Sequence, residues 1–307
     1  MAADLRTTYL GLELASPLIA SSSPLTGSLD SLRALEEAGA AAVVLPSLFE
    51  EEIGEEPTGP LALPDAYGEL LAGAKEALTI PVIASLNGTT AGGWLRLAEL
   101  LQQVGADAIE LNVYAVETDR YTSGAAVEDR TLRIVHRIKS TVTVPVAVKV
   151  SPFYTSFAHM ADRLVDARAD GIVLFNRFLQ PDIDIETHAV VPRLTLSSSD
   201  EIRLALRWIA ILRGRCPVSL AATGGAHTVD DVVKLLLVGA DVVMLASELV
   251  EQGAAAMATL TEELVAWLDG HGHRSVSEIR GLVSQTAVAD PAAFERAQYI
   301  ATLEHGV

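Results

Sequence analysis

Residues 81–112 read PVIASLNGTTAGGWLRLAELLQQVGADAIELN, and this stretch decides the fold. It opens with Pro81 and a short apolar run, continues from Trp94 with apolar residues at three-to-four spacing, and ends in a second apolar run after Gly105-Ala106-Asp107. Proline suits the first residue of a strand because its missing N–H costs nothing before pairing begins. Glycine after a helix tolerates the positive φ of a C-cap. The stretch therefore predicts a strand, a helix and a second strand.

The same unit recurs along the chain. Four short apolar runs open with a proline: Pro17, Pro81, Pro145 and Pro217. Four other runs follow a small-residue turn: Ala38-Gly39-Ala40, Val104-Gly105-Ala106-Asp107, Arg168-Ala169-Asp170 and Val238-Gly239-Ala240-Asp241. The two kinds alternate, and their continuous Val, Ile and Leu content indicates strands that are buried on both faces. Eight such strands separated by helices predict an α/β fold, the (β/α)8 TIM barrel. An open doubly wound sheet is the alternative, but the fourfold repetition favours closure.

The repeat leaves two segments outside the barrel. Residues 4–14 predict a short hairpin that covers the barrel floor, and residues 271–307 predict a C-terminal extension that packs on the barrel. We therefore expect a single domain over residues 1–307, since barrels of about 250 residues often form one domain.

Composition excludes several classes of partner. Lys and Arg number 22 against 40 Asp and Glu, a formal net charge of −18, and such an acidic chain is a poor binder of nucleic acid or anionic lipid. No apolar run approaches the roughly 18 residues of a membrane span, and the first residues carry no signal pattern. Cys216 is the only cysteine, so we expect no disulfide, no thiol metal cluster and no metal site. A soluble, cytoplasmic protein is the expectation.

Lys149 is the most informative residue at a strand end. In this fold the loops after the carboxyl ends of the strands build the active site. Lys149 closes an apolar strand, where an unpaired ammonium is costly, so an anionic or electron-rich group should receive it. That group is a cofactor or substrate, or else Glu110 or Asp107 at the barrel rim. Because only four lysines occur in the chain, we favour the ligand.

Small residues after the last two strands resemble a phosphate-binding site. Thr223-Gly224-Gly225 and Ala246-Ser247 would let backbone N–H groups approach an anion, and the helix that begins near Thr228 would point its positive end at it. Asn112 and Asn176 stand where an amide could read the edge of a ring. His227 is interpreted as a solvated residue at a helix start, and the acidic stretch 181–186 as a solvated loop or a lid.

These residues together resemble the dihydroorotate dehydrogenase family, most closely its class 1 branch, over roughly residues 7–270. The resemblance rests on Ile109-Glu110-Leu111-Asn112, the strand that ends in Lys149, Asn176, Thr223-Gly224-Gly225, and Met244-Leu245-Ala246-Ser247. The family holds FMN on a (β/α)8 barrel and takes a hydride from a dihydropyrimidine.

The resemblance implies a role for each matching residue. Ala20 and Ser21 would pass against the flavin. Lys149 would reach the N1/O2 side of its ring, where positive charge stabilises the anionic reduced form. Asn112 would lie between flavin and substrate, and Asn176 on the substrate side. The phosphate would be held by Gly224, Gly225, Ala246 and Ser247.

Other positions depart from the family. The base that family members carry three residues after the strand-4 asparagine, a cysteine or serine, is Ala115 here, and loss of a general base typically costs about 10²–10⁴-fold in rate. Tyr114 is the neighbouring group that could move a proton. Pro46 replaces an expected lysine, Pro57–Pro64 replaces an asparagine-bearing loop, and Ser197–Ser199 replaces a Gly-Gly pair.

Three functions follow from these residues. The first is an FMN-dependent oxidoreductase that oxidises dihydroorotate or a related CH–CH substrate by hydride transfer to flavin N5, with Lys149, Asn112 and Tyr114 at the reaction centre. The second is a class I aldolase that uses Lys149 as a Schiff base. The third is a non-catalytic flavin binder. We expect a small-molecule substrate and consider a homodimer; the electron acceptor stays open, and an iron–sulfur centre would have to come from a partner chain.

Overall fold

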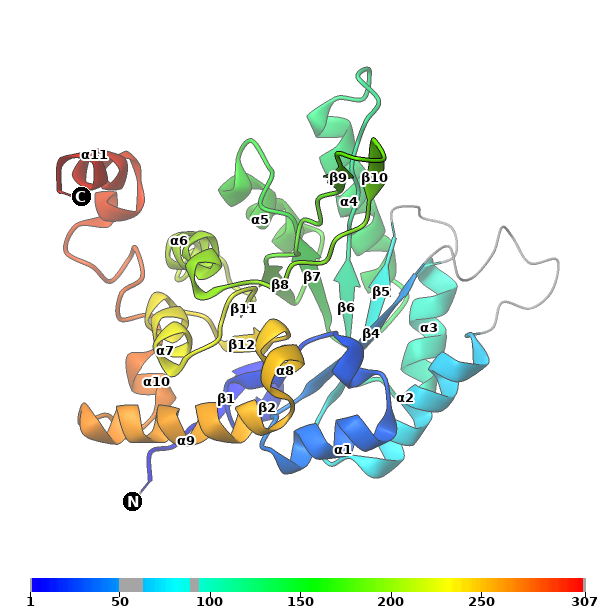
Figure 1. Cartoon of the computed structure of the whole chain (residues 1–307), viewed down its shortest axis with the longest axis horizontal. Coiled ribbons are helices and arrows are strands. Elements are labelled where there is room, and N and C mark those ends of the chain that lie inside the picture. Colours follow the sequence, from blue (N-terminus) through cyan, green and yellow to red (C-terminus); the bar gives the residue numbers. More distant parts are fainter. Residues whose placement is uncertain (1, 50–62, 89–93, 306–307) are drawn as a thin grey trace.

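The computed structural model describes residues 2–49, 63–88 and 94–305. Eight parallel strands form a closed barrel (Figure 1). In order around the ring they are β3 (Leu18–Ala20), β4 (Val43–Phe49), β5 (Val82–Asn87), β6 (Ala108–Asn112), β7 (Val146–Val150), β8 (Gly171–Leu174), β11 (Ser219–Thr223) and β12 (Val242–Leu245). The ring closes where Val243 lies opposite Leu18. The expected barrel is confirmed and the open sheet is excluded.

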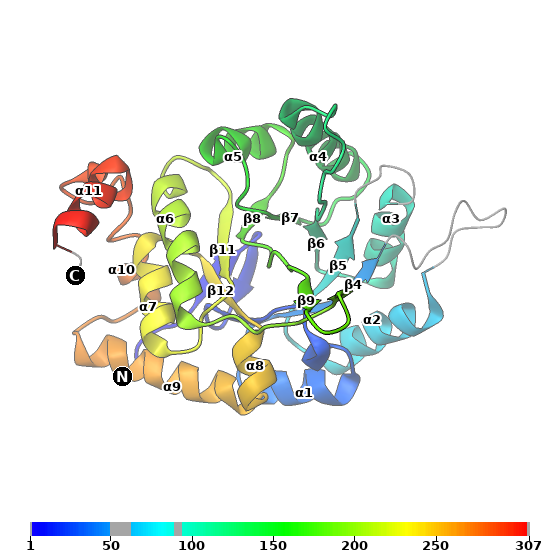
Figure 2. The same ribbon diagram turned by 45° about the horizontal axis from the view of Figure 1, so that its top comes forward.

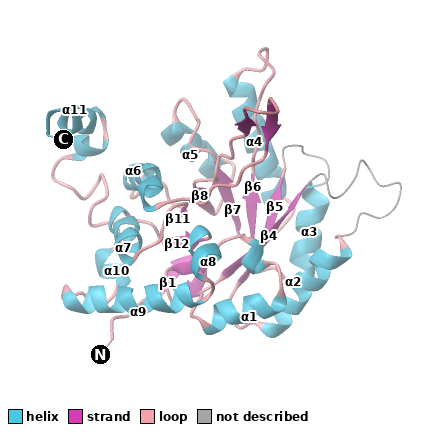
Figure 3. Cartoon of the chain, viewed as in Figure 1, coloured by secondary structure: helices cyan, strands magenta, loops and turns pink. Residues whose placement is uncertain are grey.

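Helices surround the barrel (Figures 2 and 3). They are α1 (Leu29–Glu37), α2 (Asp65–Ala77), α3 (Trp94–Val104), α4 (Gly124–Lys139), α5 (Phe157–Asp166), α6 (Ile202–Leu212), α7 (Val229–Val238), α8 (Ser247–Gln252) and α9 (Ala255–Gly270). Each long helix turns its apolar stripe inward; in α3 the buried residues Trp94, Leu97 and Leu101 recur at three-to-four spacing. Among the described residues, no helix is both long and apolar enough to cross a membrane.

An N-terminal hairpin closes the amino end of the barrel. Its strands β1 (Thr7–Tyr9) and β2 (Leu12–Leu14) are antiparallel. The amide of Leu10 donates to Ser219 Oγ at 3.0 Å, and Thr7 Oγ1 donates to the Asp241 carbonyl at 3.0 Å. Tyr9 and Leu10 are buried among the inward side chains of the strands. The predicted hairpin on the barrel floor is therefore confirmed.

Aspartates of the repeated turns join neighbouring units at the floor. Each carboxylate accepts a hydrogen bond from a backbone amide at the start of the preceding strand. It also contacts a cationic side chain from the end of the helix that precedes that strand. Asp107 contacts Val82 N and Lys75, Asp170 contacts Val146 N and Lys139, and Asp241 contacts Leu220 N and Arg213. The turn that ends in Ala-Asp, after glycine or Arg168, thus ends a helix and also fixes the start of the adjacent strand.

The turns that precede β4, β6, β8 and β12 each contain a residue in the left-handed conformation. Glycine fills the position three times, as Gly39, Gly105 and Gly239, with φ of +95°, +113° and +115°. In the remaining repeat Arg168 fills it, with φ of +73°. A non-glycine residue there costs roughly 1 kcal/mol.

Two segments differ from the sequence-based expectation. The second barrel strand was expected to end before Pro46, but β4 continues to Phe49, with an irregular ladder between Val44 and Ser47, because proline donates no ladder hydrogen bond. The acidic stretch 181–186 contributes β9 (Asp182–Asp184), which pairs with β10 (Ala189–Val191) in a hairpin.

The C-terminal extension contains α10 (Val276–Ile279), the 3-10 turn η4 (Pro291–Phe294) and α11 (Arg296–His305). Its first part is tied to the barrel helices, since the amides of Gly281 and Val283 donate to the carbonyls of Leu236 and Leu237. The later helix α11 stands outside the ring of helices (Figures 1 and 2).

Candidate functional site

A cavity of about 440 Å³ lies at the carboxyl ends of the strands, within the size range of small-molecule sites. Each of the eight barrel strands, or the loop after it, contributes a lining residue. Nine of the residues singled out in the sequence line it: Ser21, Asn112, Tyr114, Lys149, Asn176, Gly224, Gly225, Ala246 and Ser247. Ala20 does not; it is fully buried in the barrel wall, one residue before the cavity.

Lys149 lines the cavity and contacts Glu110. Its Nζ is 3.3 Å from Glu110 Oε1, and Glu110 is only 1% exposed. Glu110, one of the carboxylates considered for this lysine, is therefore its ion-pair partner. Lys149 also lines the cavity, so a ligand there could contact it as well. Asp107 contacts Lys75 instead. An ammonium has three donors, so Lys149 can serve Glu110 and a ligand together.

The Glu110 carboxylate has unused acceptor capacity. Its Oε2 is buried and has no hydrogen-bond partner among the described residues, and the same is true of the Tyr9 hydroxyl below it. Burial, and then the negative charge of Glu110, raise the pKa of Tyr9 well above its ordinary value. The centre of the barrel thus carries one buried carboxylate whose positive partner is the cavity lysine.

Two asparagines flank the lysine. Asn112 ends β6, Asn176 follows β8, and the Nδ2 of Asn176 donates to Oδ1 of Asn112 at 2.6 Å. Since β6 and β8 are the two neighbours of β7, the amides and the ammonium converge on one wall. The bond fixes the orientation of Asn112, whose own amide N–H donors remain for a ligand.

Glycines after β11 form an open turn with free donors. Gly224 and Gly225 have φ of +85° and +101°. Gly225 and Ala226 are buried, yet their amide N–H groups donate to no other residue that the structure describes. Buried orphan amides are rare because they cost a lost hydrogen bond, so this turn fits an anionic ligand.

Ser247, which begins α8 after β12, lines the cavity together with the glycine turn. Its Oγ lies 2.7 Å from Ser197 Oγ and accepts from the Ser197 amide at 3.0 Å. The serine run that replaces an expected Gly-Gly pair is thereby tied to the cavity wall. Ser197 was not chosen from the sequence as a site residue; only its place in that unusual run marked it.

The start of α7 (Val229–Val238) is capped by one of its own carboxylates. The Asp231 carboxylate accepts the amides of His227 and Thr228, each at 3.1 Å. It also accepts the hydroxyl of Ser199 at 2.7 Å. The amides of Val229 and Asp230, the first two of the helix, donate to no other described residue. That α7 points its positive end at an anion therefore stays a prediction, and the amides of Gly225 and Ala226 are further available donors.

We predict that Asp231→Ala destabilises the protein by about 1–2 kcal/mol at pH 7, as loss of a helix cap does. Burial alone would raise the Asp231 pKa, but hydrogen bonds from Ser199, His227 and Thr228 outweigh it and hold the pKa below its ordinary value. A lowered pKa adds stability that is present at neutral pH and lost as pH falls below about 4. Denaturant unfolding should show the difference between wild type and variant shrinking between pH 7 and pH 3. Exposed Asp230, in the same turn, supplies the control Asp230→Ala, for which a similar loss would contradict the assignment.

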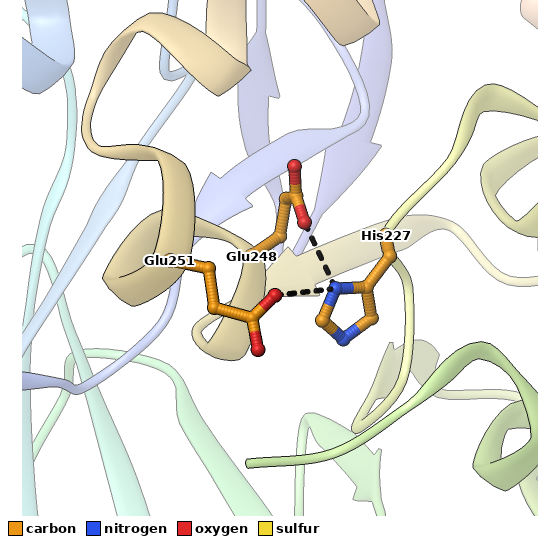
Figure 4. A group of neighbouring side chains, drawn as sticks. All are labelled: His227, Glu248 and Glu251. Carbon is orange, nitrogen blue, oxygen red and sulfur yellow. Dashed lines mark hydrogen bonds and ion pairs between the residues drawn. The ribbon is translucent and has the colours of Figure 1, made fainter.

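His227 is not the solvated residue that its position suggested. Its side chain is 14% exposed, and Nδ1 lies 2.8 Å from Glu248 Oε2 and 3.8 Å from Glu251 Oε2 (Figure 4). The three groups could in principle hold a metal ion. The 2.8 Å separation is, however, that of a hydrogen bond, so we interpret His227 and Glu248 as a bonded pair that joins the loop after β11 to α8.

The loop after β6 carries Tyr114 and Ala115. The Tyr114 hydroxyl donates to the Leu179 carbonyl at 3.4 Å, which ties this loop to the one after β8. Ala115 is exposed and offers no group that could accept a proton. Of the departing stretch Pro57–Pro64, residues 57–62 lie outside the described residues.

Comparisons with known proteins agree with this geometry. A family model described as dihydroorotate dehydrogenase matches residues 64–268. The chain is 26% identical to the catalytic subunit of dihydroorotate dehydrogenase B (NAD(+)) of Thermoplasma acidophilum, over 91% of this chain and 99% of the relative. It is 28% identical to the same subunit of Pyrococcus furiosus, over 92% and 99%. It is 27% identical to dihydroorotate dehydrogenase A (fumarate) of Lactobacillus helveticus, over 66% and 68%.

Proposed function

The chain belongs to the dihydroorotate dehydrogenase family of oxidoreductases, and from this we propose that it is an FMN-dependent enzyme whose active site is the cavity at the strand ends. Its substrate would be dihydroorotate or a related small molecule with an oxidisable CH–CH bond. The buried, unpaired amides of Gly225 and Ala226, on the same cavity as a buried ammonium, carry this proposal.

The residues present fit the cofactor. Gly225, Ala226 and Ser247 offer backbone N–H donors suited to a phosphate. A Cβ on Gly224 would meet no protein atom within 4 Å, so there is space for a phosphate beside this turn. Lys149 and Asn112 line the same cavity from β7 and β6, where they would hold the polar edge of the ring. FMN bound there would supply the hydride acceptor that oxidation of a CH–CH bond requires.

The protein side chains would orient the reactants and adjust the charge. The Lys149 ammonium would favour negative charge at the ring edge, and Glu110 would hold that ammonium in place. The Asn112–Asn176 pair would hold the substrate through its free amide donors and carbonyl. Tyr114 is the proton-bearing group beside Ala115, and this residue lines the same cavity.

The lyase alternative fits the site less well. A Schiff-base lysine must attack as a neutral amine, and here Lys149 faces a buried carboxylate at 3.3 Å. The amine would have to give up both that ion pair and its proton. One observation favours the alternative of a non-catalytic flavin binder: residue 115 is an alanine, which cannot accept a proton.

Electrons would leave this chain to an external acceptor. The relatives from Thermoplasma and Pyrococcus are named as catalytic subunits of an NAD(+) enzyme. The single cysteine, Cys216, is buried and cannot by itself hold an iron–sulfur cluster. We therefore propose that any such cluster belongs to a partner chain.

A visible spectrum and one substitution test the proposal. We expect the purified chain to bind FMN and dihydroorotate to bleach the flavin slowly under anaerobic conditions, because no base stands at position 115. Ala115→Cys should then raise the bleaching rate by about 10²-fold or more, whereas Ala115→Val should not. Absence of FMN binding would refute the proposal as a whole. Bound FMN that no dihydropyrimidine reduces, with or without the cysteine, would leave the chain a flavin binder.

A further inference from the structure

A second large cavity lies at the opposite end of the barrel. It has a volume of about 900 Å³ and lies on the floor, between the N-terminal hairpin and the starts of β8 and β11. Four cationic side chains line it, Lys139, Arg168, Arg213 and Arg280, against two carboxylates, Asp170 and Asp241. An excess of two positive charges thus gathers in one pocket of a chain whose net charge is −18.

The other repeated units of the barrel hold their floor aspartate with a single cation. At Asp107 and Asp170 one lysine suffices for the floor aspartate. At Asp241 two guanidinium groups share a single oxygen, Arg213 at 2.9 Å and Arg280 at 3.2 Å. Arg280 comes from the C-terminal extension, so this segment brings an extra cation to the floor.

Arg168 supplies the other excess charge. It occupies the left-handed position that glycine fills in the other three repeats. Its side chain is exposed and forms no ion pair or hydrogen bond with another described residue. A strained cation without a partner at the rim of a cavity points to a role in binding.

The pocket also holds its cations in place. Arg213 packs against Gly239 so closely that a Cβ there would lie 2.4 Å from Arg213 Cγ. Arg280 donates to Thr7 Oγ1 at 2.9 Å, which ties it to the hairpin. Both guanidinium groups are therefore oriented before any ligand arrives, which lowers the entropic cost of binding.

We propose that this floor pocket binds a phosphorylated small molecule. A phosphomonoester carries close to two negative charges at neutral pH and matches the local excess. Guanidinium groups suit phosphate because their forked donors fit its oxygens. The volume leaves space for the organic part of the ligand. The inference is independent of the proposed oxidoreductase activity, which concerns the other end of the barrel.

Titration of the full-length chain with pyrophosphate at low ionic strength tests this inference, with FMN added so that the upper phosphate turn is filled. Arg168→Gly restores the residue of the other repeats, so we expect its Tm to equal or exceed that of wild type. We expect its pyrophosphate affinity to fall about tenfold, as loss of a charged contact predicts. Arg280→Ala should weaken binding similarly, while exposed Arg133 on α4 gives the control Arg133→Ala, which should bind normally.

Three results would overturn the proposal. The wild-type chain does not bind pyrophosphate at millimolar concentration, Arg168→Gly binds it as tightly as wild type, or Arg133→Ala loses as much affinity as Arg168→Gly. Binding to an empty upper turn would be insensitive to Arg168. Failure of the proposed oxidoreductase function would appear as absence of FMN binding, whereas failure of the floor site would appear as absence of pyrophosphate binding that depends on Arg168.

Discussion

Lys149→Ala should weaken FMN binding by the protein and lower its stability at the same time. FMN affinity should fall by about 10–100-fold, the range for loss of a hydrogen bond to a charged group. The substitution also leaves Glu110, 1% exposed, without its counter-ion, which typically costs about 3–5 kcal/mol. Flavin titration and denaturant unfolding measure the two effects separately.

Two variants separate the loss of the ligand contact from the loss of the ion pair. Lys75→Ala breaks another lysine–carboxylate ion pair, with Asp107 at 2.5 Å, but Lys75 lies outside the cavity lining, so the flavin affinity of this variant should equal that of wild type. The double variant Lys149→Met with Glu110→Gln removes both buried charges and should recover most of the stability without recovering FMN. If the double variant binds FMN normally, the assignment of Lys149 to the cofactor is wrong.

The second large effect is expected at the glycine turn, where two adjacent substitutions should behave differently. Gly225→Ala places a Cβ 2.5 Å from the Ser198 carbonyl oxygen in a left-handed residue, so we expect a loss of about 3–5 kcal/mol in stability. Gly224→Ala meets no protein atom within 4 Å and should cost only about 1 kcal/mol of backbone strain. Its methyl group would instead occupy space on the cavity wall, so FMN affinity should fall about tenfold or more.

Gly272→Ala is the matched control for Gly224→Ala. Gly272 has φ of +78° and also meets no atom within 4 Å, but it lies outside the cavity lining. It should show the same small loss of stability and unchanged flavin affinity. Equal flavin affinity in all three glycine variants, measured on folded protein, would mean that the phosphate is held elsewhere.

The barrel could be predicted from the sequence because its signals are local. Proline at the start of a strand, glycine after a helix and three-to-four apolar spacing each act within a few residues, and the fourfold repetition confirmed their order. The hairpin at residues 7–14 followed for the same reason. Pro46 misled the strand assignment, because the barrel ladder continues past a residue that cannot donate to it.

Only the tertiary structure decided which side chains complete the sites. The sequence determined that Lys149, the asparagines and the glycine turn stand at the carboxyl ends of strands. It could not choose Glu110 as the partner of Lys149, or show that Asp231 accepts the amides of His227 and Thr228 ahead of its own helix. Nor could the sequence predict that Arg280 of the C-terminal extension contacts Asp241, which also pairs with Arg213. These contacts depend on strand register and on closure of the ring, which join residues far apart in the chain, whereas the strands and turns themselves depend on near neighbours.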